Sequence, residues 1–140
     1  EMIKQECRIK KDTKIIGVTM LTSLDRNDLK VFGVEIPESE FVENLTNLGL
    51  KSGIDGIVSS PLELIKLKKK FGNSLIYVTP GIRLNEDKTN DQKRVSSPGQ
   101  AVLDGSSILV IGRPITRSPN PIKSIEEILK NIRGSLESRN

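Results

Sequence analysis

The chain has 140 residues, the length of one ordinary domain. Its hydrophobic content is 35%, which is lean for a self-sufficient core, and its aromatic content is only 3%. The net charge is +4, but lysines and acidic residues are interspersed along the expected helices, so we interpret the charge as ordinary solubility and expect anion binding only at particular arginines. No basic run is interleaved with aromatic residues, which argues against a nucleic-acid groove.

The absence of histidine excludes several kinds of site. Histidine-based zinc sites and the Ser-His-Asp triad cannot form, and the single cysteine, Cys7, has no histidine base that would make it a nucleophile. One cysteine also rules out an internal disulfide and fits a reducing compartment. No apolar run approaches membrane-spanning length and the first residues are no signal peptide, so we expect a cytoplasmic protein without membrane contact.

Residues Glu1–Arg8 are typical of the tail of a preceding helix, and four short apolar runs after them predict strands. The runs are rich in β-branched residues and nearly continuous, the pattern of parallel strands that are covered on both faces. They are Lys14–Leu21, Gly53–Ser59, Ser74–Val78 and Ser107–Ile111.

Helical patterns stand between and after these runs. One begins at Ser39, and Ser60-Pro61-Leu62-Glu63 opens another with a capping box and a proline at the first helical position. Ser97-Pro98-Gly99-Gln100 repeats that design, and Asn120-Pro121 opens a last helix whose apolar stripe reaches Leu136.

A strand followed by a helix, four times over, predicts parallel βα units and an α/β fold. Four such units are half of an eight-unit barrel of about 250 residues. An open fragment of four strands would leave two bare sheet edges. We therefore interpret residues 1–140 as a single domain, a partial (βα)8 barrel whose N-terminal half is missing from this chain.

Polar residues follow the predicted strands, where the βα loops of a parallel barrel build the active site. Thr22 follows the first strand, Thr79-Pro80-Gly81-Ile82-Arg83 follows the third, and Gly112-Arg113 follows the fourth. Two late loops thus each carry an arginine beside a glycine. Glycine lets a backbone N–H approach a phosphate closely and arginine adds a charged, planar fork, so the pattern predicts a phosphorylated small molecule as ligand.

The strings VTMLTS, DGIVSS, VTPGIR, DQKR and IGRPIT occur in this order, and together they resemble the bacterial type of orotidine 5'-monophosphate decarboxylase. The resemblance covers Ile15 to about Leu136. The spacing of VTPGIR and DQKR, with Gly112-Arg113 further on, is its most specific part. It implies the C-terminal half, strands five to eight, of a (βα)8 TIM barrel.

The resemblance also implies a role for each matching residue. Thr22 corresponds to the residue that hydrogen-bonds the pyrimidine ring, and Gln92 to the glutamine whose amide links base and phosphate and helps to hold a closing loop. Arg83, Gly112 and Arg113 correspond to contacts on the phosphate side of the nucleotide. The polar stretch 84–90 before Gln92 is then the expected lid.

The resemblance implies that the decarboxylation itself depends on a lysine and two aspartates of a D-x-K-x-x-D motif on the third barrel strand. Asp28-Leu29-Lys30 begins like that motif, but Gly33 stands where the second aspartate would be. We interpret this segment as a solvated loop, so we expect no catalytic residue in this chain and no activity from the chain alone.

The implied reaction converts orotidine 5'-monophosphate to uridine 5'-monophosphate (UMP) and carbon dioxide, without a metal or an organic cofactor. The implied partners are that nucleotide, the missing N-terminal barrel half and a second copy of the enzyme in a homodimer. Two other hypotheses remain open. The chain is a half-barrel that binds a phosphorylated nucleotide without catalysis, or it belongs to a different phosphate-binding barrel, such as a sugar-phosphate decarboxylase. The glutamine of DQKR argues against the last.

Overall fold

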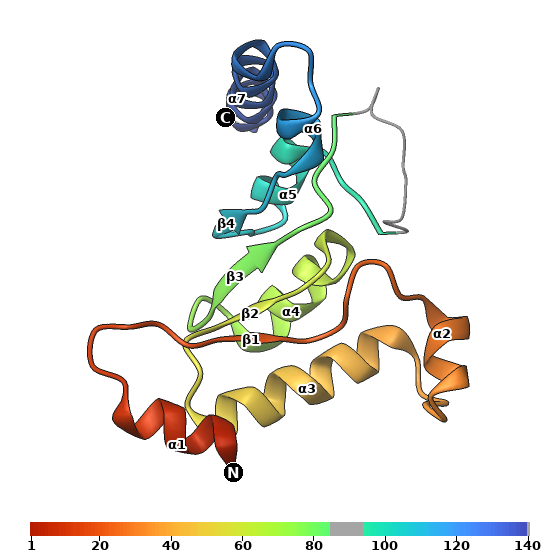
Figure 1. Ribbon diagram of the computed structural model, residues 1–140, viewed down its shortest axis with the longest axis vertical. Coiled ribbons are helices and arrows are strands. Elements are labelled where there is room, and N and C mark those ends of the chain that lie inside the picture. The colour runs from red at the N-terminus through yellow and green to blue at the C-terminus, as the bar shows by residue number, and fades with distance from the viewer. Residues whose placement is uncertain (85–93, 140) are drawn as a thin grey trace.

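The computed structural model of the chain describes residues 1–84 and 94–139. A parallel sheet of four strands, in the order β1-β2-β3-β4, lies at its centre with helices around it (Figure 1). The strands are β1 (Ile16–Val18), β2 (Gly56–Val58), β3 (Ile76–Thr79) and β4 (Ile108–Leu109). The helices are α1 (Met2–Ile9), α2 (Arg26–Val31), α3 (Glu38–Ser52), α4 (Leu64–Phe71), α5 (Pro98–Leu103), α6 (Arg113–Thr116) and α7 (Pro121–Glu137), with a 3-10 turn η1 (Pro61–Glu63) before α4.

All three strand pairs are parallel, and the order of the strands in the sheet is their order in the chain. Ile16 pairs with Gly56, Gly56 with Ile76, and Val78 with Ile108. Each strand therefore returns to its neighbour through a helical crossover, as the alternating pattern predicts. The prediction of parallel βα units is confirmed.

Three of the four predicted helix starts are confirmed at their caps. The remaining helix, α3, begins at Glu38 rather than at Ser39 and has no side-chain cap bond. The side chains of Ser60, Ser97 and Asn120 accept hydrogen bonds from the backbone N–H groups of Leu62, Gln100 and Lys123, respectively, and a proline follows each cap. These bonds satisfy N–H groups that have no partner within the helix.

The segment around Lys30 is not the solvated loop that we expected. It forms the short helix α2, in which Asp25 and Asp28 make a reciprocal capping box and Leu29 is buried. Because Asp28 accepts a hydrogen bond from the N–H group of Asp25, it has a structural role at the start of this helix.

The hydrophobic core lies between the sheet and the helices that cover it. Its fully buried members include Ile57 of β2, Tyr77 of β3, Val42 of α3 and Leu64 of α4. All four are close to 0% exposed. The two inner strands and the helices α3 and α4 therefore form the best-packed part of the chain.

The outer strands are covered less than we predicted. Val18 of β1 is 60% exposed and Ile108 of β4 is 51% exposed. The expectation that all four strands are covered on both faces is therefore wrong for β1 and β4. Each of these strands has one neighbour in the described sheet, so the other side of the strand forms no ladder of backbone hydrogen bonds there.

Helices α1 and α3 lie beside β1 at one end of the molecule, and α5, α6 and α7 lie together at the other end (Figure 1). Helix α5 packs closely on α7, where the N–H group of Gly99 donates to the side chain of Asn131 at 2.8 Å. No helix in the described part of the chain is both long and apolar enough to cross a bilayer.

Candidate functional site

The loops that follow the four strands meet at one edge of the sheet, because the strands are parallel. Thr22 lies at this edge in a tight turn that the N–H group of Leu24 closes by donating to the carbonyl oxygen of Leu21 at 3.1 Å. Thr22 is 7% exposed. Thr22 therefore follows the first strand, as predicted, but it lies in the turn beyond β1, which already ends at Val18.

A cavity of about 210 Å³ opens beside this turn. Its lining comes from the ends of three strands and includes Met20, Thr22 and Ser23 after β1, Val58 of β2 and Pro80 after β3. The lining is mostly apolar, and Thr22 and Ser23 are its residues with polar side chains. Such a cavity suits a small planar ring that has a few hydrogen-bonding groups.

The segment that carries Arg83 is held by backbone hydrogen bonds. The N–H group of Arg83 donates to the carbonyl oxygen of Ser96 at 3.0 Å, and the N–H group of Ser96 donates to Gly81 at 3.1 Å. Gly81 has a φ of 77°, a conformation that favours glycine. The Arg83 side chain is buried and donates from Nη1 to the carbonyl oxygen of Ile82 at 2.9 Å, so its guanidinium group is already oriented.

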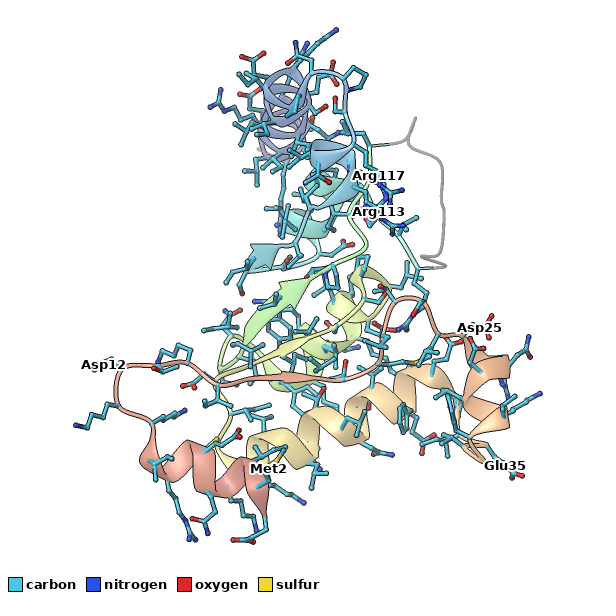
Figure 2. All side chains as sticks on the ribbon, in the orientation of Figure 1. Met2, Asp12, Asp25, Glu35, Arg113 and Arg117 are labelled. Carbon is cyan, nitrogen blue, oxygen red and sulfur yellow. The ribbon has the colours of Figure 1, made fainter. Side chains whose placement is uncertain are left out.

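Gly112 and Arg113 lie where the chain leaves β4 and enters α6. The carbonyl oxygen of Gly112 accepts hydrogen bonds from Ile115 and Thr116, and a Cβ atom at Gly112 would meet no atom within 4 Å. Figure 2 shows Arg113 and Arg117 one above the other on the same side of α6. Arg113 is partly buried and Arg117 is exposed.

Gln92 lies outside the residues that the structure describes, and so do residues 85–90 of the expected lid. Their predicted roles stay predictions. Of the five predicted binding residues, the structure thus brings Thr22, Arg83, Gly112 and Arg113 to the same edge of the sheet.

A buried ion pair at this edge was not predicted as part of the site. Nη1 of Arg94 pairs with Oε1 of Glu63, and Nη2 of Arg94 donates to the carbonyl oxygen of Leu21 at 3.2 Å. Glu63 is 6% exposed and Arg94 is 4% exposed. The sequence suggested only a capping role for Glu63, and no local pattern links two residues that are 31 positions apart.

Burial raises the pKa of the Glu63 carboxyl group above its ordinary value, and the positive charge of Arg94 opposes that rise. Two buried polar atoms beside the Glu63 carboxylate, Oγ of Ser59 and Nε of Arg94, have no hydrogen-bond partner among the described residues. Buried polar atoms are normally paired, so this edge holds hydrogen-bonding capacity that the described chain does not use.

A second, larger groove of about 600 Å³ lies between Leu84 and the helix α7. Its lining includes Glu127, Lys130 and Asn131 but none of the predicted binding residues. In the described ranges 1–84 and 94–139, no three Cys, Asp or Glu side chains come together as metal ligands would.

Comparison with known proteins identifies the family. A family model described as the orotidine 5'-phosphate decarboxylase / HUMPS family matches residues 1–128. The chain belongs to this family. The match includes β1, β2, β3 and β4. The edge of the sheet at the carboxyl ends of these strands, called the carboxyl edge below, therefore lies within the part of the chain that the family model matches.

Curated members of the orotidine 5'-phosphate decarboxylase / HUMPS family resemble the chain over most of its length. An orotidine 5'-phosphate decarboxylase of Wigglesworthia glossinidia brevipalpis is 48% identical over 119 residues, which are 85% of this chain and 51% of that protein. One of Coxiella burnetii (strain RSA 493 / Nine Mile phase I) is 45% identical over 129 residues, which are 92% of this chain and 55% of that protein. The chain thus spans about half the length of these relatives.

The crystal structure of orotidine 5'-phosphate decarboxylase from Lactobacillus acidophilus has the same fold over the shared part. It superposes with a TM-score of 0.74 at 34% identity and covers 94% of this chain and 58% of that one. The chain therefore has the parallel α/β fold of these enzymes, and its four-stranded sheet fits half of a barrel.

Proposed function

We propose that this chain supplies the pyrimidine- and phosphate-binding loops of an orotidine 5'-monophosphate decarboxylase, a carboxy-lyase that releases carbon dioxide and UMP. The observation that carries the proposal is the position of the cavity beside Thr22. It lies at the carboxyl edge of a parallel sheet whose later loops carry Arg83 and Arg113.

The roles proposed for the residues follow from their chemistry. Thr22 offers a hydroxyl group to the edge of the pyrimidine ring, at the wall of an apolar cavity. Arg83 and Arg113 supply charge and planar donors for the phosphate, and Gly112 leaves open space in which a phosphate oxygen can approach the backbone. Gln92 is proposed to link base and phosphate.

Binding by these loops contributes to the reaction at a distance. Contacts to the phosphate and the base are remote from the carbon that loses carbon dioxide, so their free energy can stabilise the assembled site in the transition state. In this proposal the lysine and aspartates that stabilise and protonate the carbanion come from a segment outside residues 1–140.

That segment would form strands one to four of the barrel, and β1–β4 of this chain would be strands five to eight. Residues 1–140 would then be part of one domain. The length of the relatives supports this proposal, since each has roughly as much polypeptide again outside the match. We also propose that the assembled enzyme is a homodimer and acts in the cytoplasm, where a single reduced cysteine is ordinary.

A non-catalytic half-barrel that binds a phosphorylated nucleotide is the alternative. It is favoured by the sequence, in which Asp28-Leu29-Lys30 is followed by Gly33 and so lacks the second aspartate of the motif. The two functions differ in one measurement, the decarboxylation of orotidine 5'-monophosphate.

The binding test is a calorimetric titration of the chain with UMP, with Arg113→Ala as the variant. We expect the substitution to weaken UMP binding about tenfold or more, because it removes a charged hydrogen-bond donor from the phosphate. The thermal unfolding midpoint should stay unchanged. The control is Arg133→Ala, since Arg133 is exposed on α7. An unchanged affinity of Arg113→Ala would refute the phosphate assignment.

The catalytic test adds the part of the Coxiella burnetii relative that the match leaves uncovered. We expect the chain alone to release no carbon dioxide from orotidine 5'-monophosphate, and the mixture to do so. Binding of UMP without decarboxylation in the mixture would favour the non-catalytic alternative.

A further inference from the structure

The side chain of Arg94 connects three loops at the carboxyl edge of the sheet. Arg94 itself follows β3, its Nη1 pairs with Glu63 after β2, and its Nη2 donates to Leu21 after β1. Both charged side chains are more than nine-tenths buried. A buried ion pair is sensitive to the loss of either partner, because the remaining charge is left without compensation.

The carbonyl oxygen of Leu21, which accepts a hydrogen bond from Arg94, also closes the turn around Thr22. The carbonyl oxygen of Leu21 accepts from the N–H group of Leu24 at 3.1 Å and from Nη2 of Arg94 at 3.2 Å. A carbonyl oxygen has two lone pairs, so both are in use. The peptide bond is planar, so the direction of this C=O group also fixes the position of the Cα atom of Thr22.

We infer that the buried Glu63–Arg94 pair is a positioning pair for Thr22, holding this residue at the wall of the cavity beside β1. Glu63 holds the guanidinium group, the guanidinium group holds the Leu21 carbonyl, and that peptide unit holds Thr22. The inference rests on the proposed function for the role of Thr22 as the contact of the pyrimidine ring. It adds two residues, on two other loops, that determine where the ring contact lies.

The planar fork of arginine is what this arrangement requires. One nitrogen faces a carboxylate and another faces a carbonyl group on a different loop, and a lysine ammonium group cannot reproduce that fixed geometry. Arg94→Lys therefore keeps a cation for Glu63 while removing the rigid link to Leu21. Glu63→Gln keeps the shape of the side chain while removing the charge that orients Arg94.

A matched control exists at the opposite edge of the sheet. Nζ of Lys10 also bridges a carboxylate and a carbonyl group, those of Asp55 and Gly53. Lys10→Met breaks a bridge of the same kind far from Thr22. It should lower stability without changing what the carboxyl edge binds.

The experiment measures two quantities in the full chain, in each of the three variants. The first is hydrogen exchange at the amide of Leu24, which reports on the turn without any ligand. The second is the pair of affinities for UMP and for ribose 5-phosphate, which shares the phosphate and sugar but has no base. We expect Arg94→Lys and Glu63→Gln to speed hydrogen exchange at Leu24 about tenfold. They should weaken the affinity for UMP about tenfold and leave the affinity for ribose 5-phosphate within about twofold of that of the unsubstituted chain.

A general loss of structure would give a different result, because both affinities would fall together. An equal loss of both affinities would overturn the inference. So would unchanged hydrogen exchange at Leu24, or a change in UMP selectivity in Lys10→Met as large as in the other two variants. If the unsubstituted chain binds neither probe, the proposed function fails. The exchange at Leu24 still decides whether Arg94 holds the turn.

Discussion

Asp55 ties the start of β1 to the start of β2. Its carboxylate accepts hydrogen bonds from Nζ of Lys10 at 2.5 Å and from the N–H group of Ile15 at 2.7 Å. These two bonds, together with the charges of Lys10 and Lys14, lower the pKa of Asp55 from 3.8 to about 2. The native chain therefore holds this carboxylate in its charged form more strongly than the unfolded chain does.

We expect this group to contribute to the acid sensitivity of the chain. Because the pKa is lowered on folding, the contribution is present above pH 3.8 and is lost as the pH falls toward about 2. Asp55→Asn should lower the unfolding midpoint at pH 7 and make it less dependent on pH below pH 4. The measurement is urea unfolding as a function of pH.

The control for this prediction is Asp12→Asn, since Asp12 is exposed in the loop between α1 and β1. Asp12→Asn should leave the pH dependence of the urea unfolding midpoint below pH 4 as it is in the unsubstituted chain. If the unfolding midpoint of Asp55→Asn depends on pH below pH 4 as strongly as that of the unsubstituted chain, the prediction is contradicted.

At the scale of single residues, the sequence predicted the positions with a local signature. Arg83 and Arg113 were predicted because each follows a predicted strand close to a glycine, and Thr22 because it follows the first apolar run. The pair of Glu63 and Arg94 has no such signature. Its partners come from different loops, and only the fold brings them together.

At the scale of elements, β2 is the strand most constrained by its neighbours. A Cβ atom on Gly56 would lie 2.3 Å from the carbonyl oxygen of Ile76 and 2.8 Å from Cδ1 of Ile16. Both contacts are shorter than real Cβ atoms show, and one of them is to backbone. Gly56 is thus required by close packing between the inner strands.

We expect Gly56→Ala to lower the free energy of unfolding by about 1–3 kcal/mol, the usual cost of overpacking a core. Chemical denaturation with circular dichroism measures it. The matched control is Gly134→Ala in α7, where a Cβ atom meets nothing within 4 Å. That change should raise the stability by about 0.5–1 kcal/mol, because alanine is the better helix former. Equal effects of the two substitutions would contradict this account of β2.

The elements themselves were largely predictable, and their lengths were not. The caps at Ser60, Ser97 and Asn120 mark helix starts by local hydrogen bonds, so a sequence pattern is enough to find them. The apolar runs were longer than the strands they form, since a strand extends only where a neighbour offers a ladder. The run 107–111 thus yields only β4, Ile108–Leu109.

At the scale of the whole molecule, the described sheet has two open edges. Val18 on β1 and Ile108 on β4 expose apolar side chains beside backbone groups that no described strand pairs. Exposed strand edges of this kind favour pairing with another chain.

We expect the isolated chain to self-associate, and sedimentation velocity to show species larger than a monomer. The double substitution Val18→Lys and Ile108→Lys should shift the distribution toward the monomer, because charges on an edge strand oppose pairing. Val31→Lys is the control, since Val31 is 84% exposed on α2, away from both edges. A monomeric unsubstituted chain over the accessible concentrations would disprove the prediction.

The sequence by itself determined the alternation of strands and helices, the helix starts, the arginine-bearing loops and the family, because each is written in short, contiguous patterns. The tertiary structure decided which residues from separate loops meet. It joined Glu63, Arg94 and Leu21 behind Thr22, made a helix of the segment around Lys30, and left β1 and β4 exposed. These features depend on the packing of segments far apart in the chain, and no local pattern encodes that packing.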